Sequence, residues 1–207
     1  MTYDLEDSVT EDLKPGARTA LQKHLTTLPG QRTAFGEVAV RINALTTRHA
    51  VDDLKAVVAL PAVDAIVIPK VQTAADLSLV DDIISSVAPD RTIKLLALIE
   101  SAKAIVNLHS ICAISPRLKG LIFAAEDYTL DLSLTRTIDM AEMLYARSAV
   151  VTAARAFEME SAIDVVFTKF REPDAEKSFL AECQNGKGLG FNGKREYTHP
   201  RESTVWL

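Results

Sequence analysis

The chain has 207 residues, of which 48% are hydrophobic and 25% charged, which is the composition of an ordinary soluble globular protein of one domain. The net charge of −5 gives no support to binding of nucleic acid or of an acidic membrane surface. No apolar run is long enough to span a bilayer. Two cysteines, Cys112 and Cys183, are too few for a disulfide framework and favour a reducing compartment, so we expect a cytoplasmic protein.

Short apolar runs of strand type alternate with segments of helical spacing along the chain. The expected strands are the end of one strand at 3–9, the runs at 37–43, 65–70, 94–100, 121–125 and 162–167, and a last strand within the segment up to 200. The expected helices are 17–28, 51–60, 73–87, 101–113, 139–159 and 174–185. Because no strand-turn-strand hairpin signal interrupts this alternation, it predicts a parallel sheet joined by crossover helices.

About seven β-α repeats are most of the units of a (β/α)8 TIM barrel, a fold of roughly 250 residues. We therefore predict an α/β protein with a single barrel domain over residues 1–207 that is incomplete at both ends. An open doubly wound sheet is the alternative architecture, because it accommodates seven units without closing. The glycine-rich segment 186–193 lacks the spacing of a phosphate-binding loop, so tight turns before the last strand are expected there.

Ionisable side chains follow five successive predicted strands, at the point where each strand ends. They are Asp4, Glu6 and Asp7 after the first strand, Arg41 after the second, Lys70 after the third, Glu100 after the fourth, and Glu126 and Asp127 after the fifth. The carboxyl ends of the strands of a parallel barrel meet at one face, where these folds have their active sites. A single acid at a strand end is more often a helix cap or a surface charge. The prediction therefore depends on the repetition over five strands.

Two of these acids end apolar runs of the same design, KLLALIE at 94–100 and GLIFAAEDY at 120–128. Glu100 and Asp127 are therefore predicted to converge on one divalent cation. Acids accompanied by few histidines or cysteines favour Mg²⁺, which prefers oxygen ligands. The four histidines are scattered and lack the spacing of a zinc site.

Two further residues are candidates for substrate contact. Arg41 suits a bidentate grip on a substrate carboxylate; its alternative role is a structural ion pair with Glu6 or Asp7. His199 follows the glycine-rich segment and is either a substrate contact or a structural histidine.

These segments together resemble the citrate lyase β-subunit-like branch of the HpcH/HpaI aldolase/citrate lyase family. The resemblance covers nearly the whole chain, and its motifs occur in family order. The matching motifs are YDLEDSV at 3–9, VRIN at 40–43, IPK at 68–70, LIES at 98–101, AEDY at 125–128, and GFxGK at 190–194 leading to His199-Pro200. The segment 107–156 is especially similar to the mitochondrial citramalyl-CoA lyase type.

The resemblance implies a (β/α)8 barrel, usually a homotrimer, that makes or breaks a carbon–carbon bond between an acyl-CoA and a short oxo acid. Citramalyl-, malyl- and citryl-CoA are the candidate esters. By the matching motifs, Glu100 and Asp127 would hold Mg²⁺, and Arg41 would bind the carboxylate of the oxo acid. The remaining strand-end residues would surround and orient these groups, namely Asp4, Glu6, Asp7, Lys70 and Glu126.

Two departures from the family pattern lead to alternative predictions of the function. Family members begin with an additional strand and a basic segment that helps to hold CoA, and they continue into lid helices that supply a catalytic acid/base Asp, here expected beyond Leu207. The chain is therefore expected to lack the first strand and the C-terminal lid. One alternative is a non-catalytic relative that keeps the metal and oxo-acid site, and another is an aldolase for free oxo acids. A missing N-terminal segment would also allow the mitochondrial matrix as the compartment.

Overall fold

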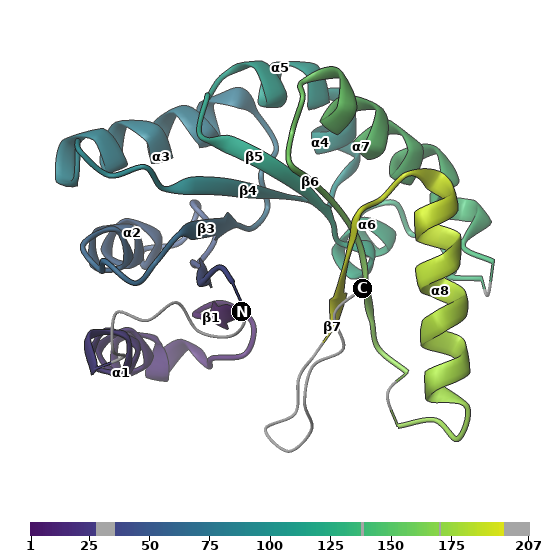
Figure 1. Ribbon diagram of the computed structural model, residues 1–207, viewed down its shortest axis with the longest axis horizontal. Helices are drawn as coiled ribbons and strands as arrows, with labels where there is room; N and C mark the ends of the chain where they lie inside the picture. The colour runs from purple at the N-terminus through teal and green to yellow at the C-terminus, as the bar shows by residue number, and fades with distance from the viewer. Residues whose placement is uncertain (28–35, 138, 170, 197–207) are drawn as a thin grey trace.

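The computed structural model describes residues 1–27, 36–137, 139–169 and 171–196. In this part of the chain seven parallel strands form one sheet in the sequential order β1 to β7. The strands are β1 Thr2–Asp4, β2 Ala39–Arg41, β3 Ala65–Ile68, β4 Lys94–Ile99, β5 Leu118–Phe123, β6 Ser161–Phe167 and β7 Gly193–Glu196. They follow one another around an arc, with helices on its outer side (Figure 1). The predicted parallel α/β sheet is confirmed as a curled half-barrel. The doubly wound alternative is wrong, because its strand order would reverse within the sheet.

The helices lie between successive strands, as the alternation of the sequence predicted. They are α1 Lys14–Thr27, α2 Ala50–Val58, α3 Ala74–Val87, α4 Ala102–Val106, α5 Leu108–Ala113, α6 Ala125–Asp131, α7 Leu144–Ala156 and α8 Ala175–Leu189, with the short 3-10 helices η1 Glu11–Leu13 and η2 Ala141–Met143. Thr73 caps α3 in a reciprocal capping box with Asp76. Among the described residues no helix is long and apolar enough to cross a membrane.

The buried side chains form two clusters on the two faces of the sheet. In β3, Ile66 and Ile68 belong to the larger cluster, whereas Ala65 and Val67 belong to the smaller one. This alternation is the period of a strand. The larger cluster includes residues of the helices, so it fills the outer layer. The smaller one consists of strand residues and Ala124, and it occupies the concave face.

Several element boundaries differ from the predictions. The expected helix 101–113 is two helices that meet at Asn107, whose side chain donates a hydrogen bond of 2.9 Å to the carbonyl of Gln72. The expected helix 139–159 is shorter, because Met140 has a left-handed backbone and η2 precedes α7. The strand expected to reach residue 125 ends at Phe123, so Glu126 and Asp127 lie in the first turn of α6.

The glycine-rich segment is the largest difference. Tight turns were expected at 186–193, but α8 continues to Leu189 and ends at Gly190, which has a φ of 100°. Gly186 lies within this helix, and its lack of a side chain allows α8 to approach β6 closely. A Cβ atom at Gly186 would lie 2.5 Å from Oδ2 of Asp164. These glycines therefore serve helix packing and helix termination.

Candidate active site

The predicted site residues lie at one edge of the sheet, at the carboxyl ends of neighbouring strands. β1 ends at Asp4, β2 ends at Arg41, and Glu100 follows the last residue of β4. Since all strands are parallel, the loops after β1 to β5 leave from the same edge. The contacts below join these loops into one group of charges.

Arg41 is the most heavily paired residue of this group. Its Nε and Nη2 lie 2.7 and 2.6 Å from the two carboxylate oxygens of Asp4, a bidentate arrangement. Its Nη1 lies 2.9 Å from Oε2 of Glu6 and 3.2 Å from Oδ2 of Asp7. The guanidinium is therefore in the structural ion pair that was the alternative for Arg41, and Asp4 is its main partner. Asp7 is the partner with the most exposed side chain, at 66%.

Asp4 holds the loop after β1 in place in addition to binding Arg41. Its carboxylate accepts hydrogen bonds from the amides of Glu6 and Ser8 and from the Ser8 hydroxyl. Burial opposes ionisation, but the hydrogen bonds and charge of Arg41 and the Ser8 hydroxyl outweigh it and lower the pKa of Asp4 to about 2. The ammonium of Lys14 also holds this loop, because it donates hydrogen bonds to the carbonyls of Leu5 and Glu6.

Lys70 connects three acids that come from three strand ends. Its backbone φ is 53°, which is uncommon for a residue other than glycine. This conformation directs its amide to the carboxylate of Glu100, to which it donates a short hydrogen bond. Its ammonium lies 3.8 Å from Oε1 of Glu6 and 3.7 Å from Oδ2 of Asp127. Glu100 and Asp127 thus lie beside the same residue.

The electrostatics of the group favour an additional cation. Burial, with a smaller contribution from the charge of Asp127, raises the pKa of Glu100 to about 7, although the hydrogen bond from the Lys70 amide and the charges of Lys70 and Arg41 oppose the rise. Burial also raises the pKa of Glu6 to about 7, where Arg41 opposes the rise and Asp7 adds to it. These raised pKa values mean that the positive charges of Lys70 and Arg41 do not fully offset the cost of burying the charged carboxylates.

The donor set fits Mg²⁺, although the acids are not gathered around one point. Among the described residues no group of three or more His, Cys, Asp or Glu side chains is close enough to hold a metal ion. Mg²⁺ in enzymes typically takes one or two carboxylates and completes its shell with water and substrate oxygens. Glu100 and Asp127 supply two carboxylates at this edge of the sheet: Glu100 accepts a hydrogen bond from the Lys70 amide, and Asp127 lies 3.7 Å from the Lys70 ammonium.

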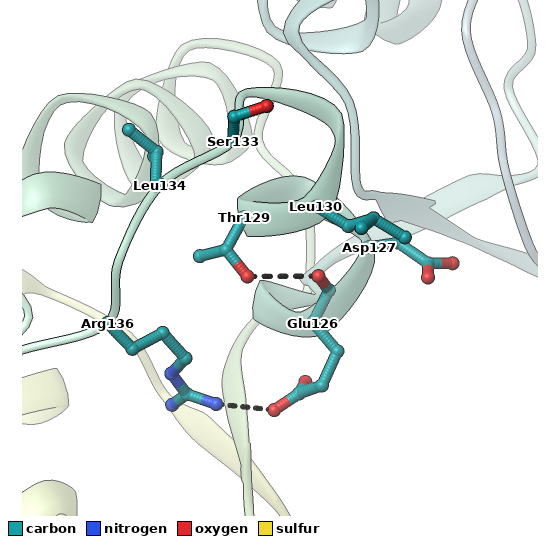
Figure 2. Close-up of a pocket in the computed structure, with 7 residues that line it drawn as sticks. All are labelled: Glu126, Asp127, Thr129, Leu130, Ser133, Leu134 and Arg136. Carbon is teal, nitrogen blue, oxygen red and sulfur yellow. Dashed lines mark hydrogen bonds and ion pairs between the residues drawn. The ribbon is translucent and has the colours of Figure 1, made fainter.

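Glu126 points away from this group. Figure 2 shows its carboxylate meeting Arg136, at a distance of 2.5 Å, while the carboxylate of Asp127 extends to the other side of α6. A shallow cleft of about 610 Å³ beside α6 is lined by both acids and by Arg136. The two acids that are adjacent in the sequence therefore share this cleft, but their carboxylates point in different directions.

Some predicted residues lie elsewhere, and some contacts were not predicted. His199 lies outside the described residues. Lys194, in the motif before it, is buried and pairs with Glu182 at 2.9 Å, so it has a structural partner. The sequence does not predict the contacts of Lys14 and Arg136, because neither residue directly follows a strand.

Comparison with known proteins agrees with this architecture. The family model described as HpcH/HpaI aldolase/citrate lyase matches residues 1–200. The chain is 37% identical over 205 residues to citrate lyase subunit beta of Leuconostoc mesenteroides subsp. cremoris, covering 97% of this chain and 65% of that protein. It is 34% identical over 204 residues to (3S)-malyl-CoA thioesterase of Cereibacter sphaeroides, covering 98% of this chain and 66% of that protein.

A solved structure shows the same fold. Protein CitE of Mycobacterium tuberculosis in complex with magnesium and pyruvate superposes with a TM-score of 0.74 at 30% identity, covering 94% of this chain and 74% of that chain. The chain spans about 65% of the length of the curated relatives it matches. This chain therefore belongs to the HpcH/HpaI aldolase/citrate lyase family, as the family-model match over residues 1–200, the sequence identity and the shared fold all indicate.

Proposed function

We propose that this protein is a Mg²⁺-dependent carbon–carbon lyase that cleaves or forms a 3-hydroxyacyl-CoA ester, such as citramalyl-, malyl- or citryl-CoA. The products of cleavage would be an acyl-CoA and a short oxo acid. The observation that carries the proposal is the meeting of Glu6, Glu100 and Asp127 at Lys70, next to Arg41. The names of the relatives and the magnesium and pyruvate bound by the similar CitE structure support it.

In this proposal Glu100 and Asp127 hold the metal. Bound Mg²⁺ would polarise the carbonyl oxygen of the oxo acid and offset negative charge that develops there. Burial of Glu100 strengthens its attraction to a cation, since few water molecules compete for its charge. The amide of Lys70 fixes the orientation of the Glu100 carboxylate.

Arg41 would bind the carboxylate of the oxo acid. Its planar fork matches a carboxylate, and Asp4 and Glu6 hold it in place. The oxo acid would take the position of Asp7, which is the most exposed partner and the most distant of the three. Asp4 and Glu6 would then remain as the residues that orient the guanidinium.

The acid/base that would move the proton of the substrate's hydroxyl group is not assigned to a described residue. As the family resemblance implies, this acid/base would be an Asp that is supplied to a neighbouring subunit of a trimer. His199 is kept as a second candidate for substrate contact. The oligomer and the CoA ester are therefore parts of the proposal.

A non-catalytic relative is the second candidate, because three acids already occupy the guanidinium of Arg41. The test is to incubate the purified protein and Mg²⁺ with citramalyl-CoA, malyl-CoA, citryl-CoA and the free hydroxy acids, and to measure acyl-CoA and oxo acid by chromatography. Release of an acyl-CoA supports the lyase, and cleavage of free acids alone supports an aldolase. If nothing is cleaved while Mg²⁺ still raises the melting temperature, the non-catalytic relative is the better account.

A further inference from the structure

The charges around Lys70 do not balance. Among the described residues, five carboxylates contact one another's partners here, those of Asp4, Glu6, Asp7, Glu100 and Asp127. The cationic groups that pair with these carboxylates are those of Arg41 and Lys70, while Lys14 donates to backbone carbonyls of the same loop. An excess of carboxylates in a partly buried group attracts a cation. The ammonium of Lys70 is the cation that lies between Glu6 and Asp127, at 3.8 and 3.7 Å.

The two cations differ in how firmly they are held. The side chain of Arg41 is 8% exposed and lies within 3.2 Å of three acids. The side chain of Lys70 is 47% exposed, and its contacts of 3.7 and 3.8 Å are longer than hydrogen bonds. Arg41 is therefore fixed, whereas the ammonium of Lys70 is loosely held and has solvent beside it.

The backbone of Lys70 is anchored independently of its side chain. Its amide donates to Glu100, and its left-handed conformation is part of the turn after β3. A lysine stem is long and has several rotatable bonds. The ammonium can thus leave Glu6 and Asp127 while the amide continues to orient Glu100.

We infer that Lys70 is the internal counter-ion of this site, and that a divalent cation bound by Glu100 and Asp127 displaces its ammonium toward solvent. This inference rests on the proposed metal site. It has two consequences of opposite sign: the ammonium stabilises the metal-free protein by neutralising Glu6 and Asp127, and it weakens Mg²⁺ binding by repelling the incoming ion.

The test measures Mg²⁺ binding by isothermal titration calorimetry rather than activity. Lys70→Met removes the charge and keeps most of the apolar stem. Lys70→Asn also removes the charge and tolerates the positive φ, so it preserves a folded protein if the methionine variant is unstable. Both variants are expected to bind Mg²⁺ roughly tenfold more tightly than the wild type. The metal-free variants should melt at a lower temperature, and Mg²⁺ should raise their melting temperature by more.

Lys94→Met is the matched control. Lys94 also bridges two acids, Glu37 and Glu160, each at 2.6 Å. It begins β4, whereas Glu100 follows the end of β4, so the two residues lie roughly 20 Å apart along the strand. Loss of this charge should leave Mg²⁺ affinity unchanged.

Three outcomes separate the ideas. Tighter binding by both Lys70 variants, with Lys94→Met unchanged, supports the counter-ion role. Unchanged or weaker binding by both Lys70 variants overturns it and leaves the proposed metal site standing, because the wild type still binds the ion. Failure of the wild type to bind Mg²⁺ overturns the metal site and the counter-ion role together.

Discussion

Asp4 and Arg41 are direct register partners in the parallel pairing of β1 with β2, and their side chains form a bidentate ion pair at the ends of these strands. The pair joins the loop after β1 to the strand that carries the proposed substrate-binding arginine. Because both residues are largely buried, removing one partner would leave an uncompensated buried charge, so the intact pair matters for stability as well as for the geometry of the site.

The first prediction concerns how the stability of the folded protein changes as the pH falls into the acid range. The folded pKa of Asp4, about 2, lies below its ordinary value of 3.8, so its ionisation stabilises the folded state at higher pH. This contribution is fully present above the unfolded pKa and is lost as pH falls through the folded pKa. Asp4→Asn should therefore cost about 2 kcal/mol near neutral pH, and the difference from the wild type should shrink in acid.

Urea unfolding of both proteins across the acid range measures this difference. Asp52→Asn, which changes a largely exposed acid, is the control and should follow the wild-type curve. A constant gap between wild type and Asp4→Asn over the whole acid range would contradict the assigned role of Asp4.

The second prediction separates two adjacent acids. Asp127→Ala should abolish Mg²⁺ binding, since it removes one of the two proposed ligands. Glu126→Ala should leave binding intact, because Glu126 is directed to Arg136. Calorimetric titration of both variants checks this, and unchanged metal binding by Asp127→Ala would count against the site.

The third prediction concerns the fork of Arg41. Arg41→Lys keeps a positive charge but cannot make the bidentate contact. We expect pyruvate binding in the presence of Mg²⁺ to weaken more than tenfold, roughly the loss of one charge-assisted hydrogen bond. The melting-temperature rise on adding Mg²⁺ should remain, which shows that the metal site is intact. Equal pyruvate affinity in the variant would remove Arg41 from the substrate site.

The fourth prediction compares two glycines of α8. Gly186→Ala should destabilise the protein by roughly 1–3 kcal/mol, because the new methyl group would meet the carboxylate of Asp164. That carboxylate cannot move freely, since it forms a fully buried ion pair with Arg147. Gly188 has open space around its Cβ position, so Gly188→Ala should stabilise the helix by up to about 1 kcal/mol. Urea unfolding gives both values, and a similar effect of the two substitutions would contradict the close packing of α8 on β6.

The sequence by itself determined the alternation of strands and helices and the edge at which the charges lie. Apolar runs and helix caps are local signals, and Thr73 and Ser101 cap α3 and α4. Because parallel strands share one direction, residues that follow strands necessarily meet at one edge. For this reason the sequence predicts a common site for Glu100 and Asp127.

Only the tertiary structure decided which charges meet. The occupation of Arg41 by Asp4, Glu6 and Asp7 depends on the register of β1 against β2 and on the path of the following loop. The place of Lys70 depends on a backbone conformation that its residue type does not favour. The need for a glycine at position 186 of α8 depends on Asp164, a residue of another element. Such contacts join residues far apart in the chain, and local sequence patterns carry no information about their distances.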